Sequence, residues 1–242
     1  MDTIKIKKQN TKIIAHRGLS GLERENTYPA FIAAGNRSYY GVETDVHVTK
    51  DGKFVIIHDE STKKVSLGAY DVDVEKSNFD DLKDLVFPDL DGSSSRRDIK
   101  IPLLQDYINI CKKYDKICVL ELKNRFNKSD IVKMIDIIKE LNYLEKVIFI
   151  SFSYDNCVDL RSLLPNAQIQ FLMYKELNDS LIEELLKYKF DLDIHFSLMN
   201  KEWVEKLHSL NVLVNVWTCD DKNRAEELAI MGVDFITTNI LE

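Results

Sequence analysis

The stretch from residue 41 to residue 58 reads GVETDVHVTKDGKFVIIH, and it decides the fold. Two apolar runs, Gly41–Val48 and Lys53–His58, flank Asp51-Gly52, a dipeptide that favours a tight turn between antiparallel strands. We therefore predict a β-hairpin in which the second run returns along the first. A hairpin removes the second run from any set of parallel strands.

Outside this hairpin, short apolar runs alternate with stretches of helical length. The clearest helical patterns are Ile131–Leu141, Leu181–Tyr188 and Lys222–Met231, the last followed by Gly232 as a helix-ending glycine. The remaining strand-like runs are Lys12–His16, Ile117–Lys123, Val147–Phe152, Gln168–Met173, Leu192–Phe196, Val212–Thr218 and Asp234–Thr238. Without the return strand, eight parallel strands remain. This alternation predicts an α/β fold, a (β/α)8 TIM barrel.

The domain organisation follows from the same rhythm. A single barrel takes about 250 residues, which fits one domain over residues 1–242. Residues from about 59 to 101 break the alternation and carry a polar stretch, Asp91–Asp98. We expect them to form a small inserted subdomain over one end of the barrel, since a loop of this length is uncommon unless it is functional.

Composition and charge exclude several classes of protein. The chain is 45% hydrophobic and 30% charged, enough for a sizeable core, and its net charge of −7 argues against a nucleic-acid-binding surface. No apolar run approaches the roughly 18 residues of a membrane span, and the N-terminus has no apolar signal region. The four cysteines lack CxxC spacing and are expected to be buried thiols, so we predict a cytoplasmic protein. The oligomeric state is not readable from the sequence.

Three carboxylates are expected together at the carboxyl ends of the strands, where barrels place their chemistry. Glu43 and Asp45 share one face of their strand, and Glu121 comes near the end of the next parallel one. A divalent cation, Mg²⁺ or Ca²⁺, would relieve their mutual repulsion, because both ions prefer oxygen ligands. The alternative is that these groups only form salt bridges with Arg17 and Lys123.

Two histidines are expected beside the carboxylates. His16 ends the first strand, and a two-residue hairpin loop would place His58 opposite Asp45, on the face that carries Glu43. A slip of one residue would move His58 to the other face. We predict general acid/base catalysis by His16 and His58.

The remaining histidines receive other interpretations. His47 and His208 are expected to be structural, and His195 is left between a structural role and a substrate contact.

The remaining site residues suggest an anionic substrate. Arg17 and Lys123 supply positive charge suited to a phosphate group. Trp217, at the end of a strand, would either form an apolar wall for a small substrate or pack in the core.

In order and spacing, these residues resemble the glycerophosphodiester phosphodiesterase family. The elements that carry the resemblance are His16-Arg17-Gly18, Glu25-Asn26-Thr27, Glu43-x-Asp45, Thr49-Lys50-Asp51-Gly52, His58-Asp59, Glu121-Leu122-Lys123, Trp217-Thr218 and the run from Gly232 to Thr238. They extend over nearly the whole chain. The resemblance implies a metal-dependent TIM-barrel hydrolase that cleaves a small-molecule glycerophosphodiester to sn-glycerol 3-phosphate and an alcohol. It makes His16 and His58 the acid/base pair, Glu43, Asp45 and Glu121 the metal ligands, and Arg17 and Lys123 the phosphate-binding residues.

The chain departs from the family pattern at three places. Ser61-Thr62-Lys63-Lys64 replaces a frequent Arg-Thr pair, Pro102-Leu103-Leu104 replaces Pro-Thr-Leu, and Thr238-Asn239-Ile240-Leu241 replaces Thr-Asp-x-Pro. These departures concern the rim and the substrate preference, because none removes a predicted ligand or acid/base residue.

Three alternatives remain open at this point. A related barrel could act on lysophospholipids or sphingomyelin, but it would need access to a lipid surface. A second alternative is a protein that binds glycerophosphodiesters without cleaving them. A third is another metal-dependent barrel, such as an aldolase or isomerase. The sequence leaves the leaving alcohol, the identity of the cation, the nucleophile and the separate roles of the two histidines undecided.

Overall fold

Eight parallel strands close into a barrel in the computed structural model, which describes residues 2–242. The order around the barrel is β1-β9-β8-β7-β6-β5-β4-β2, and β1 pairs with both β9 and β2, so no edge is left open. The strands are β1 (Lys12–Ala15), β2 (Gly41–Val48), β4 (Ile117–Leu122), β5 (Val147–Ser151), β6 (Gln168–Met173), β7 (Asp191–His195), β8 (Val214–Trp217) and β9 (Phe235–Thr238). The predicted TIM barrel is confirmed.

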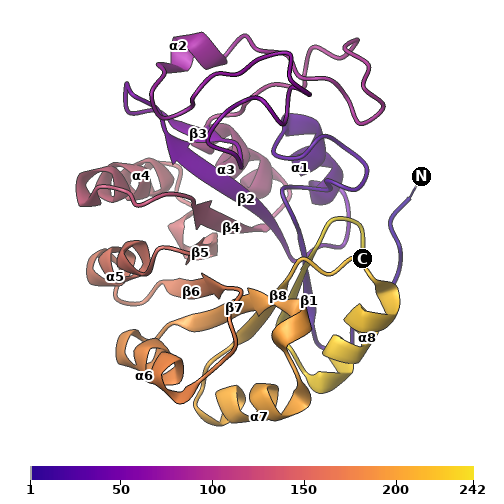
Figure 1. The fold of residues 1–242 in the computed structure, drawn as a ribbon, viewed down its shortest axis with the longest axis vertical. Coiled ribbons are helices and arrows are strands. Elements are labelled where there is room, and N and C mark those ends of the chain that lie inside the picture. The colour runs from indigo at the N-terminus through magenta and orange to yellow at the C-terminus, as the bar shows by residue number, and fades with distance from the viewer. Residues whose placement is uncertain (1) are drawn as a thin grey trace.

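The helices lie around the outside of the strands (Figure 1). They are α1 (Tyr28–Gly35), α3 (Leu104–Lys113), α4 (Lys128–Glu140), α5 (Tyr154–Leu163), α6 (Asp179–Tyr188), α7 (Lys201–Ser209) and α8 (Lys222–Met231), with the short 3-10 helices η1 (Leu144–Lys146) and η2 (Phe196–Leu198). The three predicted helices are present as α4, α6 and α8. Gly232 ends α8 with a φ of +95°, the left-handed conformation that favours glycine at a helix end.

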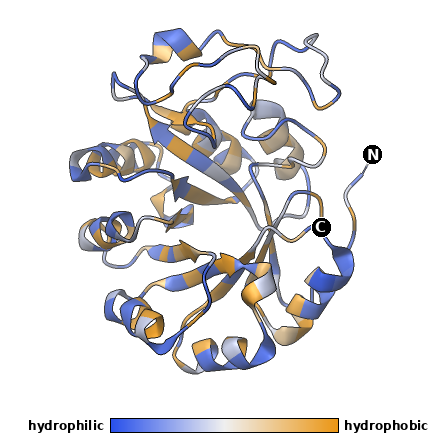
Figure 2. Cartoon of the chain, in the orientation of Figure 1, coloured by the Kyte–Doolittle hydropathy of each residue, from blue (hydrophilic) through white to orange (hydrophobic). Residues whose placement is uncertain are grey.

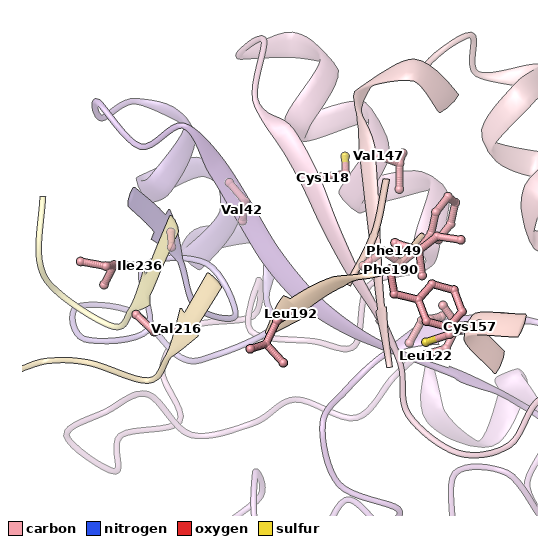
Figure 3. Close-up of a cluster of buried hydrophobic side chains, with 14 of the residues drawn as sticks. Val42, Cys118, Leu122, Val147, Phe149, Cys157, Phe190, Leu192, Val216 and Ile236 are labelled. Carbon is pink, nitrogen blue, oxygen red and sulfur yellow. The ribbon is translucent and has the colours of Figure 1, made fainter. Parts of the chain in front are cut away.

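Two apolar layers hold the barrel together. The outer layer lies between strands and helices; Figure 3 shows part of it, with Val42, Leu192 and Val216 from strands and, beside Leu122, Cys157 of α5. The helices carry alternating hydrophilic and hydrophobic stripes (Figure 2), as expected when one face packs on the sheet. The inner layer fills the barrel itself and contains Ile14, Val119, Ile148, Ile150, Leu172 and Phe235. Above it, towards the carboxyl ends of the strands, polar side chains such as Glu43, Glu121 and Asp193 join apolar ones such as Trp217.

The hairpin forms, but its predicted register is wrong. β3 (Phe54–Ile56) runs antiparallel to β2, with His47 opposite Val55 and Val46 opposite Ile56. The pairing is shifted by one residue because the loop has three residues, Lys50, Asp51 and Gly52. The Thr49 N–H closes this loop by donating to the Lys53 carbonyl. Of the loop residues only Gly52 has a positive φ, +76°. A two-residue turn of the predicted kind would need a positive φ at Asp51 as well.

The segment between β3 and α3 contains the short helix α2 (Phe79–Leu82) and long loops, and it lies at the top of Figure 1, beside the end of β2. It has a small apolar core separate from the two barrel layers. The buried members of this core are Val55, Ile57, Val74, Leu82, Phe87, Ile99 and Ile101.

All four cysteines are free and buried, as the sequence predicts. Within residues 2–242, we find no helix with the length and apolar character that a bilayer crossing requires.

Candidate active site

Three carboxylates meet inside the barrel, at the carboxyl end of β2 and β4. Glu43 and Asp45 point inward from β2, and Glu121 of β4 lies beside Asp45 in the parallel register. All three side chains are buried, with exposed fractions of 3%, 1% and 7%. One oxygen of each lies within 4.8 Å of the others, a spacing at which a single metal ion can be held.

The charges of these carboxylates depend on one another. Burial and the neighbouring Asp45 raise the pKa of Glu121 to about 8, and burial with Asp45 and Glu121 raises the pKa of Glu43 well above its ordinary value. Burial also acts to raise the pKa of Asp45, but the ammonium of Lys123 and the guanidinium of Arg17 outweigh it, so this pKa falls below its usual range. Glu43 and Glu121 therefore tend to keep their protons, because three ionised carboxylates would carry more negative charge than the two nearby cations neutralise.

A sharp turn after β1 places Arg17. Both Arg17 and Gly18 have positive φ, +53° and +77°, and a Cβ on Gly18 would come within 2.7 Å of Ala30 in α1. The turn directs the Arg17 N–H to Glu43 Oε2 at 2.8 Å and brings Arg17 Nε 3.4 Å from Asp45 Oδ2. Backbone strain of this kind at a non-glycine residue is frequent at functional sites.

Lys123 lies at the end of β4, on the same side as the carboxylates. Its ammonium is 2.8 Å from Glu121 Oε1 and 3.3 Å from Asp45 Oδ1. Burial acts to lower the pKa of Lys123, but Asp45 and Glu121 outweigh it and raise this pKa above its ordinary value. Lys123 is therefore charged at neutral pH.

His16 points into the same space from the end of β1. Its Nε2 lies 3.9 Å from Glu43 Oε2, and its Nδ1 lies 2.8 Å from Oδ1 of Asn239, the residue after β9. Burial and the nearby Arg17 lower the pKa of His16 to about 4, so the imidazole is neutral at pH 7.

His58 also reaches the site, although by a different route from the predicted one. The ladder between β2 and β3 ends at Ile56, so His58 lies in the following loop and is not subject to strand alternation. Its Nδ1 lies 2.5 Å from Asp59 Oδ1, and its carbonyl lies 3.1 Å from Nε2 of the buried His47. Burial lowers the pKa of His58, while Asp45 acts to raise it. His47, expected to be structural, supports the backbone of His58 through this contact.

One cavity of about 80 Å³ connects these groups. Every predicted site residue lines it except Asp45, which lies behind the rim and contacts Arg17 and Lys123. Trp217 lines the opposite side, with Phe152 at a centroid distance of 5.5 Å and nearly perpendicular to it. The cavity is lined by His16, Arg17, Glu43, His58, Glu121, Lys123, Ile150, Phe152, Leu172, Asp193, Trp217, Thr218 and Thr237. The structure therefore brings all the predicted side chains to one place.

The two other histidines do not line this cavity. His195 Nδ1 lies 2.8 Å from Ser197 Oγ, and its ring contacts Trp217 from outside. His208 of α7 pairs with Asp234 at 2.8 Å.

The geometry is that of a site for an anion beside a hard cation: oxygen ligands, two basic side chains and two imidazoles around a small space. The model of the glycerophosphoryl diester phosphodiesterase family matches residues 16–242 of this chain. The chain belongs to this family. It is thus an enzyme of the glycerophosphodiester phosphodiesterase class, as its sequence motifs indicate.

Similar proteins cover the chain almost end to end. A glycerophosphodiester phosphodiesterase of Caldanaerobacter subterraneus subsp. tengcongensis is 30% identical over 231 residues, which cover 95% of this chain and 94% of the relative. A crystal structure of a glycerophosphodiester phosphodiesterase from Parabacteroides distasonis is 30% identical with a TM-score of 0.79, covering 96% of this chain and 94% of that one. A phosphodiesterase of Oleispira antarctica, solved in complex with the product sn-glycerol-3-phosphate, is 26% identical with a TM-score of 0.86, covering 94% and 92%.

Several residues of this family member's site were not predicted from the sequence. Asn26 donates to Asp45 Oδ2 at 2.7 Å, Glu25 pairs with Arg17 at 2.8 Å, and Asn239 contacts His16. Asp193 of β7 is 1% exposed and has a buried Oδ1 without a hydrogen-bond partner among the described residues. For Asp193 a signal existed, since a carboxylate inside an apolar strand pattern is unusual.

Proposed function

We propose that this chain hydrolyses glycerophosphodiesters to sn-glycerol 3-phosphate and an alcohol, with one bound divalent cation, Mg²⁺ or Ca²⁺. The observation that carries the proposal is the single cavity that joins three carboxylates, two basic side chains and two histidines. The Oleispira antarctica phosphodiesterase, which has the same fold, was solved with sn-glycerol-3-phosphate, and this supports the product that we propose.

The donor set fits a hard cation. Glu43, Asp45 and Glu121 offer only oxygen atoms, and buried Asp45 Oδ1 accepts no hydrogen bond in the described part of the chain, its nearest cation being the Lys123 ammonium at 3.3 Å. Burial first and neighbouring carboxylates second raise the pKa values of Glu43 and Glu121, and a bound cation would favour their ionised forms. In our proposal these three residues hold the cation, which when bound would neutralise charge on the phosphate oxygens.

The basic side chains and the histidines have separate roles in the proposed reaction. Arg17 and Lys123 would hold the non-bridging oxygens of the phosphate, because both reach the cavity and both stay charged. One histidine would take the proton of the attacking hydroxyl as the new P–O bond forms. The other would donate a proton to the alcohol oxygen as the old P–O bond breaks, so that the alcohol leaves neutral. The attacking group is either water, which gives sn-glycerol 3-phosphate directly, or the free hydroxyl of the substrate's own glycerol, which gives a cyclic phosphate that water then opens to the same product.

The wider setting is part of the same proposal. The four free cysteines are consistent with a cytoplasmic location, where thiols remain reduced. The partner is a small molecule, since the cavity of about 80 Å³ is too small for a macromolecule.

The test measures release of sn-glycerol 3-phosphate from glycerophosphocholine and glycerophosphoethanolamine, with Mg²⁺, with Ca²⁺ and with EDTA. We expect release with at least one cation and none with EDTA. Lysophosphatidylcholine serves as a parallel substrate and would be preferred by a lipid-active barrel. Absence of release from either glycerophosphodiester with every cation, in protein shown to be folded, would overturn the proposal; tight binding without turnover would then favour a binding protein.

A further inference from the structure

The loop after β8 and the end of β9 meet beside His16. Asn239, which follows β9, donates its backbone N–H to Asp220 Oδ1 at 2.7 Å and its side-chain Nδ2 to Asp220 Oδ2 at 2.5 Å. On its other side, Asn239 Oδ1 lies 2.8 Å from His16 Nδ1. A continuous row of hydrogen bonds thus runs from Asp220 through Asn239 to the imidazole.

The chemistry of Asp220 fixes the direction of this row. Thr238 Oγ1 also donates to Asp220 Oδ1, at 2.8 Å, so that the carboxylate accepts from every partner in the row. An ionised carboxylate can only accept, and therefore the amide nitrogen of Asn239 must face Asp220 and the amide oxygen must face His16. Ser20 Oγ lies 2.7 Å from the same amide oxygen and 2.7 Å from the His16 carbonyl, so its single proton has two acceptors and the carboxylate of Asp220 is what fixes the orientation.

An oxygen opposite His16 Nδ1 requires a proton on that nitrogen. The neutral imidazole then carries its lone pair on Nε2, the nitrogen that lies 3.9 Å from Glu43 Oε2. The opposite orientation of the amide would place two acceptor oxygens against each other at Asp220 Oδ2, and it would present an N–H donor to His16 Nδ1. The tautomer of His16 is thus determined by a carboxylate that does not touch it.

We propose that Asp220 and Asn239 are positioning residues, which hold His16 with its proton on Nδ1 and so present Nε2 to the substrate. This inference rests on the proposed function of His16, but it concerns the state of the ring before any substrate binds. The side chains involved come from three parts of the chain: the end of β1, the loop after β8 and the residue after β9.

Exchange of amide and carboxylate provides a sharp test. Asp220→Asn keeps the acceptor for the backbone and for Thr238, but it places an NH₂ group opposite Asn239 Nδ2. The amide of Asn239 must then turn over, face His16 with its nitrogen and move the imidazole proton to Nε2. Asn239→Asp instead places two carboxylates at hydrogen-bond distance, where they repel each other.

The double variant Asp220→Asn with Asn239→Asp restores the row of hydrogen bonds, with the amide now at position 220 and the carboxylate at position 239. The new amide donates to the new carboxylate, and that carboxylate accepts from His16 Nδ1–H. We expect each single variant to lose about 10²-fold or more in kcat on glycerophosphocholine, with KM unchanged. The double variant should exceed the better single variant by about tenfold or more.

The His16 tautomer is the measurement that separates the two explanations, because it would not change if Asp220 and Asn239 only stabilised the fold. The ¹⁵N chemical shifts of the His16 ring, assigned with a His16→Gln variant, should show the proton on Nδ1 in the natural protein and the double variant, and on Nε2 in Asp220→Asn. Asp221→Asn is the matched control: Asp221 accepts from the Arg224 N–H at the start of α8, where asparagine caps as well as aspartate. Melting temperatures confirm that each variant is folded.

Two results would overturn the inference. The first is an Nε2–H tautomer of His16 in the natural protein. The second is an Asp220→Asn variant in which His16 keeps its proton on Nδ1 and kcat is unchanged. Failure of the proposed function is separable, because the chemical shifts are read without substrate or cation. A natural protein that has the Nδ1–H tautomer but no phosphodiesterase activity would support the positioning of His16 and refute the reaction.

Discussion

The two sides of the cavity are built from different kinds of side chain. The side formed by β1, β2 and β4 carries the buried carboxylates and the partly buried Arg17, Lys123 and His16. The side formed by β5, β6 and β8 carries Ile150, Phe152, Leu172 and Trp217, with Asp193 among them. Both sides use inward positions of parallel strands at a similar height, so the fold alone does not distinguish them. The difference teaches that the charged side is suited to act on the phosphate and the apolar side to recognise the rest of the substrate.

Removing charge from the first side should have the largest effect. Asp45→Asn takes away the carboxylate that faces Arg17, Lys123 and the proposed cation, and we expect kcat/KM to fall by about 10³-fold or more. Steady-state release of sn-glycerol 3-phosphate measures this loss. Asp51→Asn, in the exposed loop of the same hairpin, is the control and should retain the natural activity. Comparable activity in the two variants would show that the charged side does not act on the phosphate.

Removing the imidazole of either histidine in the cavity should have the next largest effect. His16→Ala and His58→Ala should each lower kcat by about 10²-fold or more, since each deletes a proton carrier. His208→Ala provides the comparison, because that ring pairs with Asp234 away from the cavity. If His58→Ala turned over substrate as fast as His208→Ala, then His58 would have no catalytic role.

The repulsion among the carboxylates should appear in the stability of the cation-free protein. The pKa of Glu121 is about 8 when folded and is near 4.5 in the unfolded chain, so between pH 6.5 and 8 the folded state binds the extra proton. Stability should therefore fall as pH rises through this window, by at most about 2 kcal/mol. His16 acts in the opposite direction, but mainly below this window, because its pKa is about 4 when folded and 6.5 when unfolded.

Chemical denaturation in EDTA at pH 6.5 and pH 8 measures this change. Glu121→Gln should remove most of the decrease, and added Mg²⁺ or Ca²⁺ should stabilise the natural protein more at pH 8 than at pH 6.5. A natural protein in EDTA that is equally stable at both pH values would contradict the assigned repulsion.

Changes on the apolar side should have the smallest effect on catalysis. Trp217→Ala removes a wall of the cavity, and we expect KM for glycerophosphocholine to rise by about tenfold with a smaller change in kcat. Trp203→Ala on α7 is the matched control, because Trp203 does not line the cavity. A loss confined to kcat would mean that Trp217 acts on the charged side and not on substrate recognition.

The barrel was predictable because its signals are local. Periodicity along the chain reveals strands and helices, and the hairpin dipeptide identifies which strand is not parallel. The register of that hairpin was not predictable from the dipeptide, because the difference between two and three loop residues depends on the φ of Asp51 and on the Thr49 backbone contact. His58 still reaches the cavity, because the chain leaves the ladder at Ile56 and is no longer bound by alternation.

The supporting contacts of the site could not be predicted in the same way. His16 is 223 residues away from Asn239 in the sequence, and only closure of the barrel brings β9 beside β1. The support of His58 by His47 depends on a loop conformation that follows no period. The motif residues could be named in advance because they resemble those of a family; their partners required the folded chain.

The segment between β3 and α3 has its own small apolar core, so the two cavity histidines belong to parts of the fold that can differ in local stability. His16 stands on the continuous barrel, whereas His58 stands at the base of a unit held by Phe87, Leu82 and their few neighbours. Such a unit can open as one cooperative piece while the barrel remains intact, and native-state hydrogen exchange would resolve the two events. A substitution such as Phe87→Ala, distant in sequence from His16, would then separate the proposed acid/base pair and abolish activity in a protein that still melts as a folded barrel.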